Sequence, residues 1–356
     1  MCREENGTMT SKAGMHPQME TDEPRVSVLT PAFNSAKYLP ETLESALAQT
    51  FTDFELLIVD DGSTDDTAAI AHAYAERDAR IRVIRHPHRG IAAARNAAIA
   101  QARGRFLALL DSDDLWCPEY LAEQVAILQQ HPELAVVSAN AINLGGAFDG
   151  QPLFGCTAQS HLRKVSLLTL VRDEQTISIF TVFRREVVDL IGGFDEAFRR
   201  SEDYDFWLRA SAAGCRIAVY PKPLGLYRRR PDSMSADEVQ MLHAARTVLS
   251  KLRQRCGDRP ELQASVDWQL ARLAKRVMLA TARELLLEGD MAHLAVQFGA
   301  LAEATGMRRY RVAEWLSHRV PGTIWWAYRC KLRFRHLARS RRSHSNSVWL
   351  PRGVAQ

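Results

Sequence analysis

Residues 54–65 read Phe-Glu-Leu-Leu-Ile-Val-Asp-Asp-Gly-Ser-Thr-Asp, an apolar run that ends in two adjacent carboxylates, a glycine and hydroxyls. We predict a buried strand that carries Asp60 and Asp61 to its carboxyl end, where open α/β sheets bind ligands. The pattern returns at residues 105–114, where a second apolar run stops at Asp111, Asp113 and Asp114. We therefore expect two strand ends to converge on one acidic site, which requires a cation.

The surrounding sequence alternates strand and helix patterns. Short β-rich runs at 26–30 (closed by Pro31), 54–59, 81–84 and 105–110 are separated by helical periodicity at 38–49, 63–75 and 91–102. This order predicts an α/β fold with parallel strands and right-handed crossovers. Beyond Asp114 we expect a helix at 118–130, a strand at 134–138, a β-rich run at 176–183, a helix from Ser201, and mostly helix over 237–301.

The charge is distributed unevenly. The chain has 356 residues and a net charge of +4, and residues 307–356 hold twelve Arg or Lys against one acid, Glu314. Such a tail is typical of contact with anionic lipid or nucleic acid, and a solvated tail is the plain alternative. Because Trp315, Trp325, Trp326 and Tyr328 lie among the cations, we expect residues 307–342 to meet an anionic membrane surface and expect no nucleic acid. The alternative is a helix whose aromatic side chains pack in the core.

Other features indicate where the protein works. The six cysteines (Cys2, Cys117, Cys156, Cys215, Cys256, Cys330) are far apart and lack metal-ligand spacing, which predicts reduced thiols. No apolar stretch reaches the roughly eighteen residues that a transmembrane helix needs, and the N-terminus lacks the apolar core of a signal peptide. We expect a cytoplasmic protein with a peripheral contact to the inner face of the cell membrane.

Each group of candidate residues can also be explained by a role in the fold alone, without a function. The acids at 111–114 and at 60–61 suit turns and helix caps as well as a cation or a ligand. Arg89 and Arg95, near a helix start, suit either a phosphate or solvent. The acids that follow Ser201 either complement the helix dipole or include a general base. The motifs GxGxxG and GxxxxGK[ST] do not occur, which argues against nicotinamide cofactors and P-loop ATP chemistry.

Five segments, taken in order and spacing, resemble family 2 glycosyltransferases of the GT-A fold. They are residues 26–34, 47–65, 90–96, 110–116 (Leu-Asp-Ser-Asp-Asp-Leu-Trp) and 192–209 (Gly-Gly-Phe-Asp-Glu through Glu-Asp-Tyr-Asp-Phe-Trp-Leu-Arg). The resemblance implies a mainly parallel mixed sheet flanked by helices, the fold of nucleotide-diphospho-sugar transferases, with a helical C-terminal extension. The match covers residues 25–235, which we expect to form the GT-A domain. Composition and pattern predict a disordered segment before it (1–24), and a helical extension (236–306) and a basic aromatic tail (307–356) after it.

The resemblance also implies an activity, the inverting transfer of a hexose from a nucleotide-diphosphate donor to a saccharide or lipid-linked acceptor in cell-envelope polysaccharide synthesis. Asp203 would be the general base, and Mg²⁺ or Mn²⁺ would bind Asp113, with Asp114 as a substitute. The donor would contact Pro31, Phe33, Asp60, Asp61, Arg95 and Asp111. Acceptor-side candidates are Glu202, Arg228 and Arg230.

The chain departs from the family pattern in two places. Many relatives have a histidine before the Ser-x-Ser pair, whereas this chain has Arg230 ahead of Ser233 and Ser235. It also lacks the Gln-x-x-Arg-Trp element of processive synthases, which favours single additions.

Two other functions compete with sugar transfer. A sugar-nucleotide nucleotidyltransferase would normally show a glycine-rich basic loop near its N-terminus, and this chain has none. A non-catalytic saccharide-binding relative would not need carboxylates for both a metal and a base.

Overall fold

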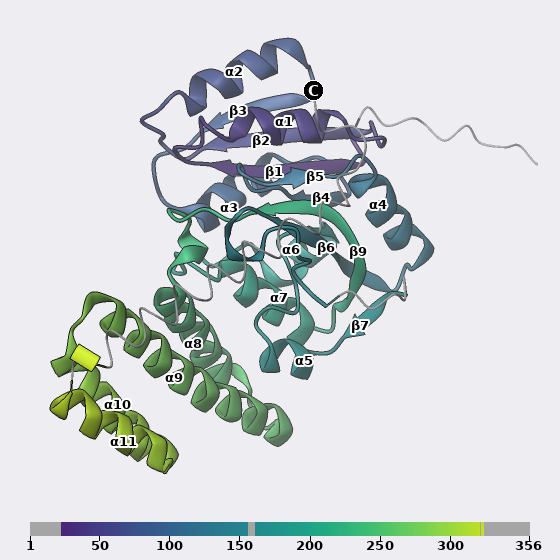
Figure 1. The fold of residues 1–356 in the computed structure, drawn as a ribbon. Helices are drawn as coiled ribbons and strands as arrows, with labels where there is room; N and C mark the ends of the chain where they lie inside the picture. Colours follow the sequence, from purple (N-terminus) through teal and green to yellow (C-terminus); the bar gives the residue numbers. More distant parts are fainter. Residues whose placement is uncertain (1–22, 156–160, 321, 324–356) are drawn as a thin grey trace, which may run out of the picture.

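The computed structural model describes residues 23–155, 161–320 and 322–323. Within them a nine-stranded sheet has the order β3-β2-β1-β4-β8-β6-β9-β5, and β7 pairs with β9 (Figure 1). The strands are β1 (Val26–Ala32), β2 (Phe54–Asp60), β3 (Ile81–Arg85), β4 (Phe106–Leu109), β5 (Leu115–Trp116), β6 (Leu134–Leu144), β7 (Arg163–Val165), β8 (Thr181–Arg184) and β9 (Arg216–Arg228).

Eleven α-helices connect or flank these strands in the described part of the chain. They are α1 (Leu39–Leu47), α2 (Thr67–Arg77), α3 (Ile91–Gln101), α4 (Tyr120–Gln130), α5 (Leu167–Arg172), α6 (Glu186–Ile191), α7 (Glu202–Ala212), α8 (Glu238–Arg255), α9 (Pro260–Glu288), α10 (Met291–Thr305) and α11 (Arg308–Arg319). Two short 3₁₀ turns, η1 (Gly146–Phe148) and η2 (Met234–Ala236), follow β6 and β9. None of the helices formed by the described residues is both long and apolar enough to cross a bilayer.

The first half of the sheet confirms the predicted alternation. Strand β1 pairs in parallel with β2 on one side and β4 on the other, and β3 pairs in parallel with β2. Alternate residues of these strands enter opposite cores, so that Leu56 and Ile58 pack with α1, α2 and α4, while Leu57 and Val59 pack with α3 and α7. Both faces are covered, which explains why the strands are apolar without interruption.

Several predicted boundaries were wrong. Strand β1 does not close at Pro31, which pairs with Val59 of β2, because β4 accompanies β1 only as far as Leu29 and leaves the other side of Pro31 without a ladder. The expected strand 176–183 shrinks to β8, because Ser178 bonds Ala139 O through its hydroxyl at 2.8 Å instead of joining the ladder. Strands β5, β7 and β9 and helices α5 and α6 were not predicted.

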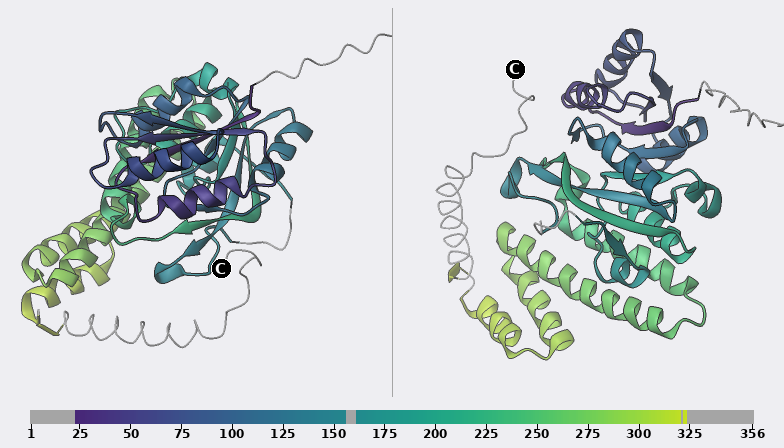
Figure 2. Two further views of the ribbon diagram at one scale, coloured as in Figure 1. Left: turned by 90° about the horizontal axis from the view of Figure 1, so that it is seen from above. Right: turned by 90° about the vertical axis from the view of Figure 1, so that its right-hand side faces the viewer.

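The C-terminal helices lie together on one side of the sheet, with α10 and α11 farthest from it (Figures 1 and 2). Leu249 of α8 and Val266 of α9 are buried in the same apolar core as Leu57 and Phe206. Helices α10 and α11 instead pack against the second half of α9 through small clusters around Leu294 and Leu301. The first two helices of the extension are therefore continuous with the core of the sheet domain.

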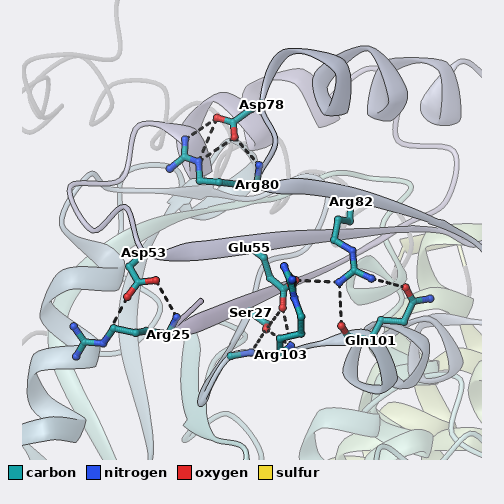
Figure 3. A network of polar contacts seen from close by, with 10 residues as sticks. Arg25, Ser27, Asp53, Glu55, Asp78, Arg80, Arg82, Gln101 and Arg103 are labelled. Carbon is teal, nitrogen blue, oxygen red and sulfur yellow. Dashed lines mark hydrogen bonds and ion pairs between the residues drawn. The ribbon is translucent and has the colours of Figure 1, made fainter. Parts of the chain in front are cut away.

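A buried carboxylate stands at the amino-terminal edge of the sheet (Figure 3). Glu55 of β2 accepts hydrogen bonds from Ser27 Oγ and from the backbone N–H of Arg103, both at 2.7 Å, and pairs with Arg82 at 3.1 Å. Burial alone would raise the pKa of Glu55, but these hydrogen bonds outweigh it and lower the pKa. A Cβ at Gly104 would lie 2.5 Å from Ser27 N, so glycine is needed for this close approach.

Three of the six cysteines, Cys117, Cys215 and Cys256, are free thiols. Cys2, Cys156 and Cys330 lie outside the described residues, as do almost all of the expected disordered segment 1–24 and the tail aromatics Trp325, Trp326 and Tyr328.

Candidate active site

The parallel strands β1, β2 and β4 end at one edge of the sheet. Asp60 is the last residue of β2, and Asp111 follows β4 by two residues, with the end of β1 between them. This confirms that the two acidic runs reach the same edge. The loop that follows β1 lies between the two acidic runs, and its Ser35 Oγ is 2.7 Å from Ser112 Oγ in the second run. The acids of each run therefore contact different partners.

A buried arginine holds the second acidic run. Arg95 of α3 is 1% exposed, and its Nη2 and Nη1 donate to Asp111 Oδ1 at 2.7 Å and to Glu202 Oε1 at 2.5 Å. Burial disfavours the charged guanidinium, but Asp111, Glu202 and Asp203 outweigh that cost and raise the pKa of Arg95. Arg95 is therefore a fixed cation between three carboxylates, and the surface interpretation of this residue was wrong.

Asp203 lies in the first turn of α7, beside this cluster. Its Oδ1 accepts the N–H of Tyr204 at 2.8 Å, and its side chain is half-buried. Burial raises the pKa of Asp203, Arg95 opposes the rise, and Asp111 adds to it. The residue before the helix, Ser201, has φ 58°, a left-handed conformation that is uncommon for a residue with a side chain and that sets the direction in which α7 starts.

Asp113 and Asp114 contact two arginines at and just beyond the end of β9, Arg228 and Arg230. Asp113 Oδ2 is 2.9 Å from Arg230 Nε, and Asp114 Oδ1 accepts the N–H of Arg228 at 2.8 Å. Burial and the neighbouring Asp111 raise the pKa of Asp113 to about 6, although Arg230 opposes the rise. Asp114 is 1% exposed, and burial, with the charges of Asp113 and Asp111, raises its pKa well above the ordinary range.

These acids fit one kind of metal site. In the described ranges, no three His, Cys, Asp or Glu side chains come together in a way that would hold a metal by themselves. Mg²⁺ and Mn²⁺ often bind one or two carboxylates and take their remaining ligands from substrate phosphates and water. Asp113 suits that arrangement, since a divalent ion would offset both the burial and the charge of Asp111, which together raise its pKa.

The carboxylates of the first acidic run, Asp60 and Asp61, form hydrogen bonds to the neighbouring loops. Asp61 Oδ1 is 2.7 Å from His86 Nδ1 and accepts the N–H of Arg89 at 3.0 Å, while Oδ2 accepts the N–H of Gly90 at 2.8 Å. Asp60 Oδ1 accepts the N–H of Ser63 at 3.1 Å. These bonds fix the turn that leads into α3, whose first residues follow Gly90.

An aromatic platform stands beside this loop. Phe33 is 44% exposed, and its ring stacks on His88 with centroids 4.1 Å apart. Pro31 is buried in β1, two residues before Phe33, so it can shape the platform from below but offers little surface of its own.

Sequence reasoning missed several residues that hold the site together. Asn34, which has φ 47°, accepts the N–H of Thr64 at 2.9 Å and joins the loops after β1 and β2. Asn96 of α3 bonds the backbone N–H and C=O of Phe194 at 2.8 and 2.9 Å and so docks the 192–196 turn. Both asparagines lie inside the segments that resemble the family, so their position in these motifs could have identified them.

A cavity of about 550 Å³ between α4 and β9 contains none of the predicted site residues.

These features define an α/β protein with acidic side chains at the carboxyl edge of its parallel strands. Residues 27–191 match the family model for glycosyl transferase family 2. Over residues 27–191 the chain therefore carries the sequence of glycosyltransferase family 2, and its fold is of the GT-A type.

The succinoglycan biosynthesis protein ExoO of Rhizobium meliloti (strain 1021) is 34% identical over 234 residues, which cover 62% of this chain and 65% of ExoO. Residues 1–349 of TarS from S. aureus, solved with UDP-GlcNAc, align with TM-score 0.56 and 23% identity over 86% of this chain and 92% of that one. The mannosyltransferase PcManGT from Pyrobaculum calidifontis, solved with GDP-Man and Mn²⁺, aligns with TM-score 0.52 and 20% identity over 87% of each chain. The chain spans less than two thirds of the length of the first curated relatives.

Proposed function

We propose that this protein is an inverting hexosyltransferase that uses a nucleotide-diphosphate sugar and a divalent metal. One observation carries the proposal: Arg95 joins Asp111, at the end of β4, to Glu202, next to Asp203 at the start of α7. These two hydrogen bonds support a site in which the donor side and the base share one buried cation. The nucleotide sugars in TarS and PcManGT support the donor class.

We assign the donor side to the loops after β1, β2 and β4. The exposed face of Phe33 would stack on the base, with Pro31 beneath it and Asp60 and Asp61 holding the adjacent turn. Asp111 is 24% exposed beside Arg95 and is available to the sugar or the diphosphate.

We assign the metal to Asp113. Its side chain is 19% exposed, whereas Asp114 is almost fully buried and bonds the backbone of Arg228. Mg²⁺ or Mn²⁺ there would neutralise charge on the departing nucleoside diphosphate. The Mn²⁺ in PcManGT supports this assignment.

We propose that Asp203 removes the proton of the acceptor hydroxyl as that oxygen attacks the anomeric carbon from the face opposite the diphosphate. A carboxylate whose pKa is raised is a stronger base while it stays ionised near neutral pH. Glu202 is 5% exposed and bonded to Arg95, so we assign it to positioning Arg95 and not to contact with the acceptor.

The experiment that tests the reaction class is an assay of the chain with a panel of nucleotide sugars and Mn²⁺. A glycosyltransferase releases nucleoside diphosphate, by slow hydrolysis or by transfer to an added acceptor. Formation of nucleoside triphosphate and sugar 1-phosphate from the nucleotide sugar when pyrophosphate is added would indicate a nucleotidyltransferase. No turnover with any donor, despite binding, would indicate a saccharide-binding relative.

We propose a saccharide or lipid-linked acceptor in cell-envelope polysaccharide synthesis, which the kinship with ExoO supports. A peripheral contact with the cytoplasmic face of the membrane would serve such an acceptor. Helix α11 is suited to it, because Val312 and Trp315 are 55% and 57% exposed, and Arg319 lies over the Trp315 ring at 5.9 Å. Tyr310 of the same helix is instead buried against Phe298. On that side of α11 the aromatic side chain packs against the protein, as in the alternative interpretation of the tail.

Vesicle co-sedimentation tests the membrane contact. We expect the full chain to pellet with vesicles that contain anionic lipid, and Trp315→Ala to weaken this binding. Trp268→Ala is a matched control, since Trp268 of α9 is 55% exposed and also has an arginine, Arg272, over its ring at 5.7 Å. Equal loss in both variants, or no pelleting of the full chain, would contradict the proposal.

A further inference from the structure

Two arginines that leave β9 cover the acidic run after β4, and they are held very differently. Arg228, the last residue of β9, bonds Asp114 through its N–H and the carbonyl of Asp113 through Nε, both at 2.8 Å, and reaches Glu41 at 2.5 Å. The backbone N–H, Nε and Nη2 of Arg228 are therefore all engaged in hydrogen bonds. Arg228 anchors the strand end.

Arg230 is held more loosely. It lies beyond the end of β9, its Nε is 2.9 Å from Asp113 Oδ2, and that N–H makes no hydrogen bond to any described residue. Its guanidinium rests over the ring of Tyr38 at 4.8 Å, its Nε is also 3.8 Å from Oδ1 of the exposed Asp232, and its side chain is 20% exposed. The contact with Asp113 is thus an attraction of charges without a directed bond, made by a buried Nε in a side chain that is partly exposed elsewhere.

The charge of Arg230 occupies the position that a divalent ion would need. A cation bound to Asp113 Oδ2 and a guanidinium 2.9 Å from the same oxygen repel each other. A guanidinium displaced from Asp113 would remain near the metal, where a diphosphate is the matching anion, because arginine binds phosphate oxygens in pairs.

We propose that Arg230 is the resident counter-ion of Asp113 and exchanges this carboxylate for the donor diphosphate when the metal binds. The inference depends on the proposed metal-assisted transfer. The exchange couples the two ligands. Metal alone displaces Arg230 from Asp113 and leaves it only the exposed carboxylate of Asp232, 3.8 Å away, whereas metal and diphosphate together give Arg230 a new partner. By linkage, the nucleotide then strengthens metal binding by the same factor as metal strengthens nucleotide binding.

Mn²⁺ binding to the full chain, measured by electron paramagnetic resonance with and without UDP or GDP, tests the exchange. Protein-free samples correct for Mn²⁺ held by the nucleotide itself. In the unmodified chain we expect the nucleotide to strengthen Mn²⁺ binding by about 5–150-fold, the usual range of coupling between sites. Arg230→Ala should bind Mn²⁺ alone more tightly and show a coupling several-fold smaller.

Arg229→Ala is the matched control, because it also removes a positive charge one residue away. Arg229 Nε donates to Asn143 at 2.7 Å and its guanidinium lies over Tyr227 at 4.5 Å, with no contact to Asp113. This variant should keep the coupling of the unmodified chain.

Equal Mn²⁺ affinity in the unmodified chain and Arg230→Ala would overturn the exchange and leave the proposed transfer standing, and so would equal changes in both arginine variants. Failure of every protein to bind Mn²⁺, even with UDP or GDP, would overturn the metal-assisted function and the exchange together.

Discussion

Arg95 and Glu202 are 107 positions apart in the sequence, and their side chains meet in a hydrogen-bonded ion pair of 2.5 Å in the protein interior. The pair fixes α3 against the start of α7. Two separate motifs, the one that contains Arg95 and the one that contains Asp203, therefore form a single site.

Replacement of Arg95 by Met should destabilise the fold strongly. The change leaves Asp111, Glu202 and Asp203 without their common cation, and breaking a buried pair in this way typically costs about 3–5 kcal/mol. Urea unfolding at neutral pH measures the loss. Glu202→Gln keeps a hydrogen-bond acceptor for Arg95 and should cost less, so an equal or larger loss in Glu202→Gln would contradict this account of the pair.

Glu55→Gln should reduce stability at neutral pH by about 1–3 kcal/mol, because the hydroxyl of Ser27 and the backbone N–H of Arg103 lose a charged acceptor. The pKa of Glu55 is lowered in the folded state, so its contribution is present above the unfolded pKa, about 4.3, and is lost as pH falls through the folded value. Urea midpoints for the two proteins should therefore differ at pH 7 and converge on acidification below about pH 4.

Asp53→Asn is the control for that measurement. Asp53 also pairs with an arginine near the same sheet edge, Arg25 at 3.9 Å, but it is 48% exposed (Figure 3). Its loss should cost about 0–1 kcal/mol. A difference for Glu55→Gln that stays constant from pH 7 to pH 3 would refute the assigned pKa direction.

Asp113→Ala should weaken the Mn²⁺-dependent part of nucleotide binding and leave the metal-free part nearly unchanged. Asp114→Asn should keep metal dependence, because its amide oxygen can still accept the N–H of Arg228. Calorimetry with UDP or GDP at several Mn²⁺ concentrations separates the two. The reverse ranking would move the metal to Asp114.

The parts of the fold that follow from local pattern were predictable from sequence. Continuous apolar runs marked β2 and β4, and their ends placed Asp60 and Asp111 at one edge. Strand β9 was missed because Pro221, Pro223 and Gly225 interrupt its pattern. These residues are tolerated where the register with β6 shifts, around Ala139–Ile142, which only the folded sheet reveals.

The partners of the charged site residues were not predictable, because they come from distant segments. The sequence presents Asp61 as a ligand-binding acid, whereas the structure shows three donors on it from residues 86–90. Likewise, nothing local to Arg230 indicates that it lies against Asp113, 117 positions earlier in the chain.

The role of Asp203 is tested most directly by turnover and donor affinity of Asp203→Asn, compared with Asp205→Asn. Asp205 lies in the same turn of α7, but its carboxylate pairs with Arg209 at 2.6 Å, so we expect it to take no part in the reaction. We predict that Asp203→Asn lowers turnover by about 10²–10⁴-fold while the dissociation constant for the donor changes little, and that Asp205→Asn keeps most of the turnover. An unchanged rate in Asp203→Asn would contradict the proposal that this carboxylate is the base.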